Sequence, residues 1–457
     1  MKKKYALIIL FLAVIGFVSC SSDDGNYVAL EMETNPDLVS VVQNSTITIS
    51  IYNNDNNIPT NGSLTTSLPT NGELTITDPN NTPNNPSDNV LSYTPQANFT
   101  GSDSFTYTIC NSESPQMCKT ETVSITITSG SPVVFDASQV PYATLSEYHF
   151  FEGDIKDQNP AFGVIPYEPI STLFTDYAHK KRFIWMPNNT VATYGNDYDL
   201  LNFPDGTILI KSFYYNNVQP SGDTKIIETR LMIKQATGWE FANYIWNDAQ
   251  TEATYDLSGG TVSNLQFIDN GVTRTINYEI PPESDCFTCH KNAGISKPIG
   301  PEPQNLNKDF PFATGVQNQL QKLVDIGYLN EKPATINTVV NWEDTTQSLD
   351  LRVRSYLDIN CAHCHTDLGH CDYRPMRLAF NESDNETNLG VCVEPEENVS
   401  PFIKIVLPGN ISKSMLHFRL STTQEQYKMP LIGRSIVHEE AVQLIEDWIN
   451  SLTTTCP

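Results

Sequence analysis

The sequence predicts a multidomain protein with an N-terminal β-sandwich, a second mostly-β domain and a C-terminal α-helical region. Three observations predict this class: alternating apolar and polar residues near the N-terminus, aromatic-rich strand patterns in the middle, and helical spacing of apolar residues confined to the last third. The chain has 457 residues, of which 39% are hydrophobic, so it can fill several cores.

Residues 1–19 have the pattern of a signal peptide. Three lysines, Lys2 to Lys4, precede an apolar run that is too short to remain as a membrane span. The run ends at Cys20 in a sequence that resembles a lipoprotein cleavage box, which implies that Cys20 becomes the lipidated N-terminus. Ordinary secretion with a free Cys20 is the alternative. The acidic segment 21–25 resembles export tags of surface lipoproteins, which implies the outer membrane and leaves its periplasmic or cell-surface face open.

Residues 28–129 are rich in Asn, Thr, Ser and Pro and alternate strictly in 46–51 and 122–127, which predicts the β-sandwich. The segments 93–95 and 99–107 resemble the bacterial cadherin-like, immunoglobulin-like module of surface proteins. That resemblance implies a spacer between the anchor and the rest of the chain. Asp55 and Asp103 are candidate calcium ligands in such a module, with a structural role in turns as the favoured alternative.

The second β domain is predicted over residues 137–280, after a linker near 129–136. Strand patterns such as 206–214 and 229–233 alternate with turn signals and carry many aromatic residues.

Helical periodicity is predicted only after this domain, in two units at 281–344 and 345–457. The first predicted helix carries Val316, Leu320, Leu323 and Val324, and the second carries Leu349, Val353 and Leu357. The last has one apolar face formed by Ala441, Leu444, Ile445, Trp448, Ile449 and Leu452.

Two CxxCH motifs carry the chemistry of the chain, at residues 286–290 and 361–365. In this motif two thiols add to the vinyl groups of haem, and the adjacent histidine becomes an iron ligand. The motifs therefore predict two covalently bound haem c groups. Their residues are Cys286, Cys289 and His290 in the first unit, and Cys361, Cys364 and His365 in the second. A zinc site built from the four thiolates is the alternative.

The order of a helix, the second motif, Met429 and a closing helix resembles a class I cytochrome c. This resemblance implies that His365 is the proximal ligand of the second iron and Met429 the distal one, with Met376 and Met415 as rivals. We expect His363, inside the motif, to be an exposed spacer.

A wider resemblance covers residues 142–452 and rests on segments 173–183, 228–231 and 429–431. They are similar to a family of exported bacterial di-haem lipoproteins, which implies haem and export but no particular reaction. A weaker likeness, from Phe203 to Lys211 and at the first motif, is to hydroxylamine-oxidising cytochromes in which a lysine is crosslinked to haem. It makes Lys211 the candidate crosslink, with a solvent-facing strand lysine as the favoured alternative.

Five of the ten cysteines remain after lipidation and haem attachment. We predict disulfides between Cys110 and Cys118 and between Cys371 and Cys392, which leaves Cys456 free or variably paired.

The first haem is predicted to have an open or weakly held distal position, because no methionine occurs between Lys291 and Pro375. A ligand would come from the preceding β domain, or water would take the position. The side chains available there are His149, His179, Met186 and Met232. Three basic residues follow His179 and favour its neutral form.

With 27 basic and 53 acidic residues, the net charge of −26 disfavours nucleic acid as a partner. The same charge could steer a basic redox protein, with a solvated exterior that keeps the protein soluble as the favoured alternative. We therefore expect a cell-envelope electron-transfer cytochrome, attached to the membrane through its lipid. Two alternatives stay open. One is a haem oxidoreductase, peroxidase-like or oxidising small nitrogen compounds at an open first haem. The other is a surface lipoprotein whose β domains bind glycan.

Overall fold

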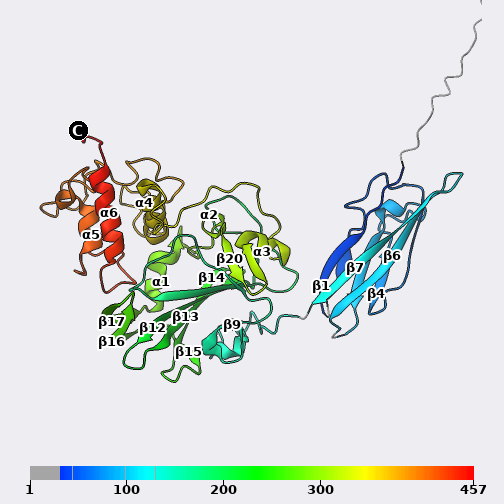
Figure 1. Cartoon of the computed structure of the whole chain (residues 1–457), viewed down its shortest axis with the longest axis horizontal. Helices are drawn as coiled ribbons and strands as arrows, with labels where there is room; N and C mark the ends of the chain where they lie inside the picture. Colours follow the sequence, from blue (N-terminus) through cyan, green and yellow to red (C-terminus); the bar gives the residue numbers. More distant parts are fainter. Residues whose placement is uncertain (1–30, 44, 98, 129) are drawn as a thin grey trace, which may run out of the picture. The chain divides into compact units, whose positions relative to one another are not determined.

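The computed structural model describes residues 31–457 except 44, 98 and 129, and these form two compact units that divide between Ser129 and Gly130 (Figure 1). The predicted signal peptide, the lipidated Cys20 and residues 28–30 lie outside the described residues. Among the described helices, none has the length and apolar character needed to cross a membrane.

The first unit is a sandwich of two sheets, as predicted. Its strands are β1 (Asp37–Val42), β2 (Ile47–Ile49), β3 (Gly62–Thr66), β4 (Gly72–Thr77), β5 (Val90–Pro95), β6 (Gly101–Asn111) and β7 (Cys118–Thr128). The sheets have the orders β1-β7-β6-β3 and β2-β5-β4, and β1 runs parallel to β7. Alternate residues of β6, such as Phe105 and Tyr107, are buried in the shared core, which explains the period of two in the sequence.

The second unit is built on an eight-stranded sheet. The path of the sheet is β10-β11-β12-β13-β14-β15, and β16 pairs with both β12 and β17. Its strands are β10 (Ile165–Pro166), β11 (His179–Trp185), β12 (Ile208–Val218), β13 (Asp223–Gln235), β14 (Gly238–Trp246), β15 (Ala253–Tyr255), β16 (Gly260–Asp269) and β17 (Val272–Ile280). The short pair β8 (Phe151–Glu152) and β9 (Asn159–Pro160) forms a separate ladder.

Both faces of the central strands are covered. Ile210 and Leu231 pack in one core with Trp185 and Tyr244, whereas Leu209 and Met232 belong to a core on the opposite face. Successive side chains of a strand point to opposite faces, so a strand covered on both sides is apolar almost throughout.

Short helices and hairpins follow the sheet. They are α1 (Glu283–His290), β18 (Lys291–Asn292), β19 (Ile295–Ser296), α2 (Pro303–Leu306), β20 (Asp309–Phe312), β21 (Gly315–Asn318), α3 (Gln319–Asp325), α4 (Leu349–Leu357), α5 (Met415–Ser421) and α6 (Glu439–Ser451). The prediction that Val316 belongs to a helix is wrong: Val316 lies in β21 and is 73% exposed. The helix begins only at Gln319, because Asn318 caps it by accepting a hydrogen bond from the backbone N–H of Gln321.

The C-terminal region is helical only in part, since long irregular segments join α4, α5 and α6. Helix α6 buries Leu444, Ile445, Trp448 and Ile449 against residues of α4 and the irregular segments. Burying each of these side chains contributes about 1.5–3 kcal/mol. The predicted apolar face of the last helix therefore forms the core that encloses the second motif.

Candidate functional site

The first CxxCH motif lies on helix α1, directly after the sheet. Cys286, Cys289 and His290 are spaced i, i+3 and i+4, so a single helix face carries all three side chains. The Nδ1 atom of His290 is 2.8 Å from the backbone oxygen of Lys297. A carbonyl can only accept, so Nδ1 donates and Nε2 is left as the ligand atom. Burial lowers the pKa of His290 to about 4, which keeps the imidazole neutral, as a metal ligand requires.

The second motif continues helix α4 through a π-helical turn at Asp358–Ala362 (η4). The backbone N–H groups of Cys364 and His365 both donate to the oxygen of Cys361, at 3.1 and 3.0 Å. His365 is 7% exposed, and burial lowers its pKa to about 4. Its imidazole is therefore also neutral and available to a metal.

The two motifs, far apart in the sequence, lie side by side. The Sγ atoms of Cys289 and Cys364 and a ring nitrogen of His363 all lie within 4.8 Å of one another. The segments after the motifs also meet, because the side-chain amide of Asn292 donates to the oxygen of Asp367 at 2.8 Å. The expectation that His363 is an exposed spacer is wrong: it is partly buried against the first motif.

Each motif borders its own cavity. The first cavity is lined by Cys286, Cys289 and His290 on one side and by the sheet residues Leu209, Lys211, Arg230, Met232, Phe241 and Asn243 on the other. The second cavity is lined by Cys361 and His365 and by three methionines, Met376, Met415 and Met429. Met429 thus borders the same cavity as His365, and so do both of its rivals.

Of the four side chains expected as distal ligands of the first iron, Met232 alone lines the first cavity. His179 is exposed at the start of β11, and His149 is the C-cap of a 3-10 helix on a different part of the surface. Met186 is buried in the same core as Met232 but does not line the first cavity. Although the His179 side chain meets water, its pKa is lowered, chiefly by partial desolvation, with Lys180 adding to the effect.

Lys211, which we expected on a solvent-facing strand position, instead lines the first cavity. Strand periodicity alone could not decide this orientation, because both faces of β12 are covered.

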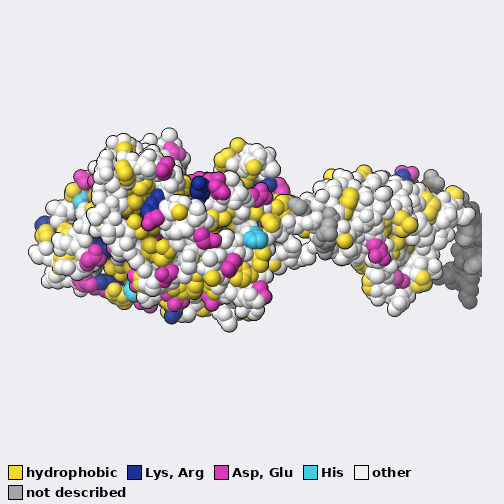
Figure 2. All heavy atoms as spheres, turned by 90° about the horizontal axis from the view of Figure 1, so that it is seen from below, with side chains coloured by type: hydrophobic (Ala, Val, Ile, Leu, Met, Phe, Trp, Pro, Cys, Tyr) yellow, Lys and Arg dark blue, Asp and Glu magenta, His cyan; other side chains and the backbone are white. Residues whose placement is uncertain are grey.

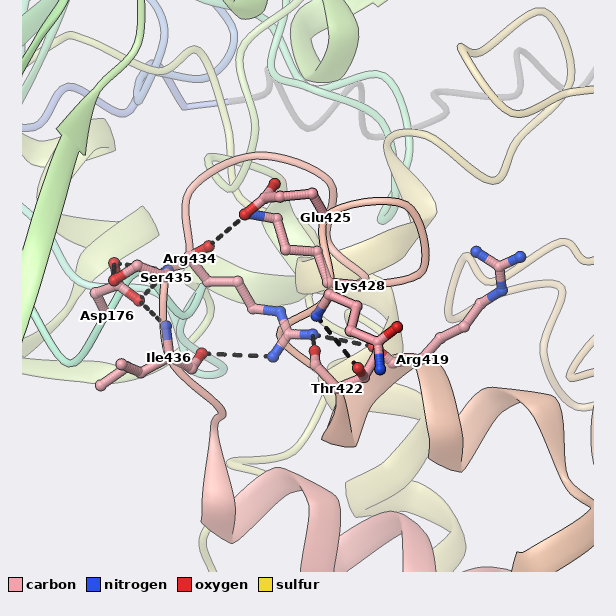
Figure 3. A network of polar contacts seen from close by, with 9 residues as sticks. Asp176, Arg419, Thr422, Glu425, Lys428, Arg434, Ser435 and Ile436 are labelled. Carbon is pink, nitrogen blue, oxygen red and sulfur yellow. Dashed lines mark hydrogen bonds and ion pairs between the residues drawn. The ribbon is translucent and has the colours of Figure 1, made fainter.

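A polar network holds the loop that follows Met429 (Figure 3). Asp176 is 2% exposed, and its carboxylate accepts hydrogen bonds from the backbone N–H of Ser435 at 2.7 Å and of Ile436 at 3.2 Å. Arg434 donates to the backbone oxygens of Leu420 at 3.1 Å and Thr422 at 2.6 Å. This network ties the sheet region to the loop, whose residues border both cavities.

The remaining cysteines are paired differently from our prediction in one case. Cys110 and Cys118, facing each other on β6 and β7, form a disulfide. The predicted Cys371–Cys392 bond is wrong, because Cys392 is bonded to Cys456. Cys371 is instead buried beside the second motif, where its N–H donates to the oxygen of Cys364 at 3.0 Å. The motif cysteines are unpaired in the described structure.

In the first unit, both candidate calcium ligands take part in hydrogen bonds within the sandwich. Asp55 accepts from the hydroxyl of Tyr107 at 2.9 Å, and Asp103 from that of Tyr93 at 2.8 Å. Asp103 also accepts from the N–H groups of Thr70 and Asn71. The two carboxylates therefore stabilise turns and strands.

Comparison with known proteins identifies the first unit. Residues 31–128 match the family described as bacterial Ig domain. The solved structure of protocadherin gamma C5 EC1-3 is similar at 8% identity over 43% of this chain and 65% of that chain, with a TM-score of 0.17, so less than two thirds of that protein is spanned. Protocadherin gamma B7 extracellular cadherin domains 1–4 are similar at 7% identity over 54% and 74%, with a TM-score of 0.16. No curated protein matches. The family match shows an immunoglobulin-type module, and the structural likenesses add nothing further.

Proposed function

We propose that this chain is a di-haem c-type cytochrome of the bacterial cell envelope that transfers electrons, held to the outer membrane by lipid on Cys20. One observation carries the proposal: each CxxCH motif presents its histidine and at least one unpaired cysteine to a largely apolar cavity, and the motifs adjoin each other.

The residues present fit haem c. Cys286 and Cys289 would hold the first group with His290, and Cys361 and Cys364 the second with His365 and Met429. Cys361, His365 and Met429 line the second cavity, whereas the thiol of Cys364 lies against Cys289 of the first motif. Bound haem supplies an iron that accepts and donates single electrons. The carbonyl of Lys297 orients His290 by accepting a hydrogen bond from Nδ1, as carbonyl groups commonly do for metal-bound histidines.

Adjacent attachment points favour electron transfer between two centres. The thiols of Cys289 and Cys364 lie within 4.8 Å, so the haem edges bonded to them would be neighbours. The immunoglobulin-type module has the role of a spacer in this proposal. On the face drawn in Figure 2, acidic side chains of the larger unit are scattered rather than gathered in one patch, which suits a basic redox partner met by general electrostatic attraction.

Replacement of each cysteine pair tests the proposal. Cys286→Ala with Cys289→Ala and, separately, Cys361→Ala with Cys364→Ala should each leave one haem per chain in protein matured in the periplasm. A matched control, Cys371→Ala, should keep two. If both double variants still carry two haems per chain, the assignment of the motifs as haem-attachment sites is overturned.

A haem oxidoreductase is the second candidate, and the first cavity favours it. Among the described side chains expected as ligands, only the buried thioether of Met232 borders that cavity. If the distal position is open, cyanide or carbon monoxide should perturb one haem of two, and the response should persist in the variant without the second pair. If both haems are low-spin and neither spectrum responds to cyanide or carbon monoxide, the oxidoreductase is refuted and electron transfer remains as the proposed function.

A further inference from the structure

Basic side chains form a row across the sheet beneath the first cavity. Arg182 on β11 faces Lys211 on β12, Lys211 faces Arg230 on β13, and Arg230 faces Asn243 on β14. Residues directly opposite each other in antiparallel strands project from the same face of the sheet. Three cations and one amide therefore stand side by side on one face, and Lys211, Arg230 and Asn243 line the cavity with Cys286 and His290.

The row is enclosed by protein. Arg182 is 7% exposed and Asn243 is 6% exposed. The Nζ of Lys211 is 5.1 Å from the centre of the Phe213 ring, and the guanidinium carbon of Arg230 is 4.4 Å from it. A fourth cation, Lys180, lies 5.9 Å from the same ring.

The neighbouring protein groups satisfy only part of this row. Arg230 pairs with Glu228, whose side chain is fully buried, and Lys180 donates to the backbone oxygen of Leu173 at 3.0 Å. Neither polar side-chain atom of Asn243 has a hydrogen-bond partner among the described residues. Burial lowers the pKa of Lys211 well below its usual range, and the flanking arginines add to this.

Burying these cations and this amide costs free energy unless an anion pairs with them. Like charges directly opposite each other destabilise a sheet, and burial of an unpaired charge or amide carries a desolvation penalty. Glu228 pairs with Arg230, and the carboxylates of Asp176 and Glu168 act on Lys180 and Arg182. Lys211, in contrast, forms no ion pair within the described residues. An anion in the first cavity would face cationic donors at Lys211 and Arg230 and the amide of Asn243, which is the donor set that oxyanions prefer.

We infer that Lys211, Arg230 and Asn243, with Arg182 beside Lys211 in the row, form a binding site for a carboxylate or another small oxyanion in the first cavity. The carboxylate has two sources. It can be a propionate of the haem held by Cys286 and Cys289, a source that rests on the proposed function, or a free oxyanion that enters the cavity.

Calorimetric titration with sodium formate and sodium phosphate, in buffer free of other oxyanions, tests the site. The titrations use the full chain matured with haem and the Cys286→Ala, Cys289→Ala variant, which lacks the first haem. A free oxyanion site predicts that the full chain binds one of the probes at one site. A propionate site predicts that the full chain binds neither probe, whereas the variant without the first haem binds formate.

In whichever protein binds, Lys211→Met should weaken binding by about tenfold to a hundredfold, the effect of losing one charge-assisted hydrogen bond. Lys211→Arg should retain binding, because arginine keeps a cationic donor at this position, and Lys211→Met should keep the circular dichroism spectrum of the parent protein. The control is Lys225→Met, on the same strand as Arg230 but paired with the exposed Asp248, and it should bind normally. The inference is overturned if neither protein binds either probe, or if Lys211→Met and Lys225→Met bind equally. If no haem attaches at all, the proposed function fails, and the same titrations still test the anion site on the haem-free chain.

Discussion

Asp176→Asn should loosen the loop that carries Met429. Asparagine keeps the shape of the side chain and tolerates the positive φ of 43° at this position, so the change tests the acceptor rather than the backbone. The carboxylate accepts from the backbone N–H groups of Ser435 and Ile436 and from the Ser435 hydroxyl. An amide offers one acceptor atom instead of two, so one buried donor loses its partner.

That loss should lower the free energy of unfolding by about 1–3 kcal/mol, the cost of a buried donor left without an acceptor. The assay is urea unfolding followed by circular dichroism, together with the weak far-red absorption band that a methionine sulfur gives ferric haem. This band should disappear at a lower urea concentration than in the parent protein. The control is Glu425→Gln, which changes the exposed partner of the buried Lys428 near the same loop. Because the glutamine oxygen can still accept a hydrogen bond from Lys428, this change should cost less than about 1 kcal/mol. Equal unfolding midpoints for the two variants would refute the role of Asp176.

Three further outcomes are expected. Replacing Cys392 and Cys456 by serine should lower the free energy of unfolding by about 4 kcal/mol, because the bond closes a loop with a sequence separation of 64; an unchanged melting temperature would contradict this. Burial lowers the pKa of His438 from 6.5 to about 4, so the unfolded chain takes up the proton at a higher pH than the folded chain does. The free energy of unfolding should therefore fall as the pH drops from about 6.5 to about 4, and His438→Gln should flatten that pH dependence in urea titrations. Met429→Ala should keep two haems, remove the far-red band and lower the potential of the second haem, whereas Met415→Ala should keep the band; the reverse pattern would make Met415 the ligand.

Local patterns allowed the strands and the motifs to be predicted from the sequence. Period-two alternation located the sandwich, whose β6 buries alternate residues, and the CxxCH spacing identified six side chains that border the two cavities or join the motifs. The extent of the helix near Val316 was overestimated, because the apolar residue there belongs to a hairpin and is exposed.

Features that depend on tertiary contacts could not be predicted in this way. Nothing in the spacing of Cys289 and Cys364 indicates that their sulfurs meet, and cysteine spacing does not fix connectivity, so the partner of Cys392 was misassigned. The row of cations requires the register of three strands, which places Lys211 between Arg182 and Arg230. A sequence signal existed, namely three strands each with a basic residue amid apolar neighbours, but only the pairing shows that these residues converge.

Pyridine haemochrome quantitation, combined with zinc analysis of the same protein, decides whether the chain carries two covalent haems. The measurement uses protein matured in the bacterial envelope, purified after denaturation so that only covalently bound haem is counted, while zinc is determined on the native sample. The proposed function predicts two haems per chain and no stoichiometric zinc. A chain without covalent haem that holds one zinc ion, bound by the neighbouring Cys289, His363 and Cys364, would contradict it.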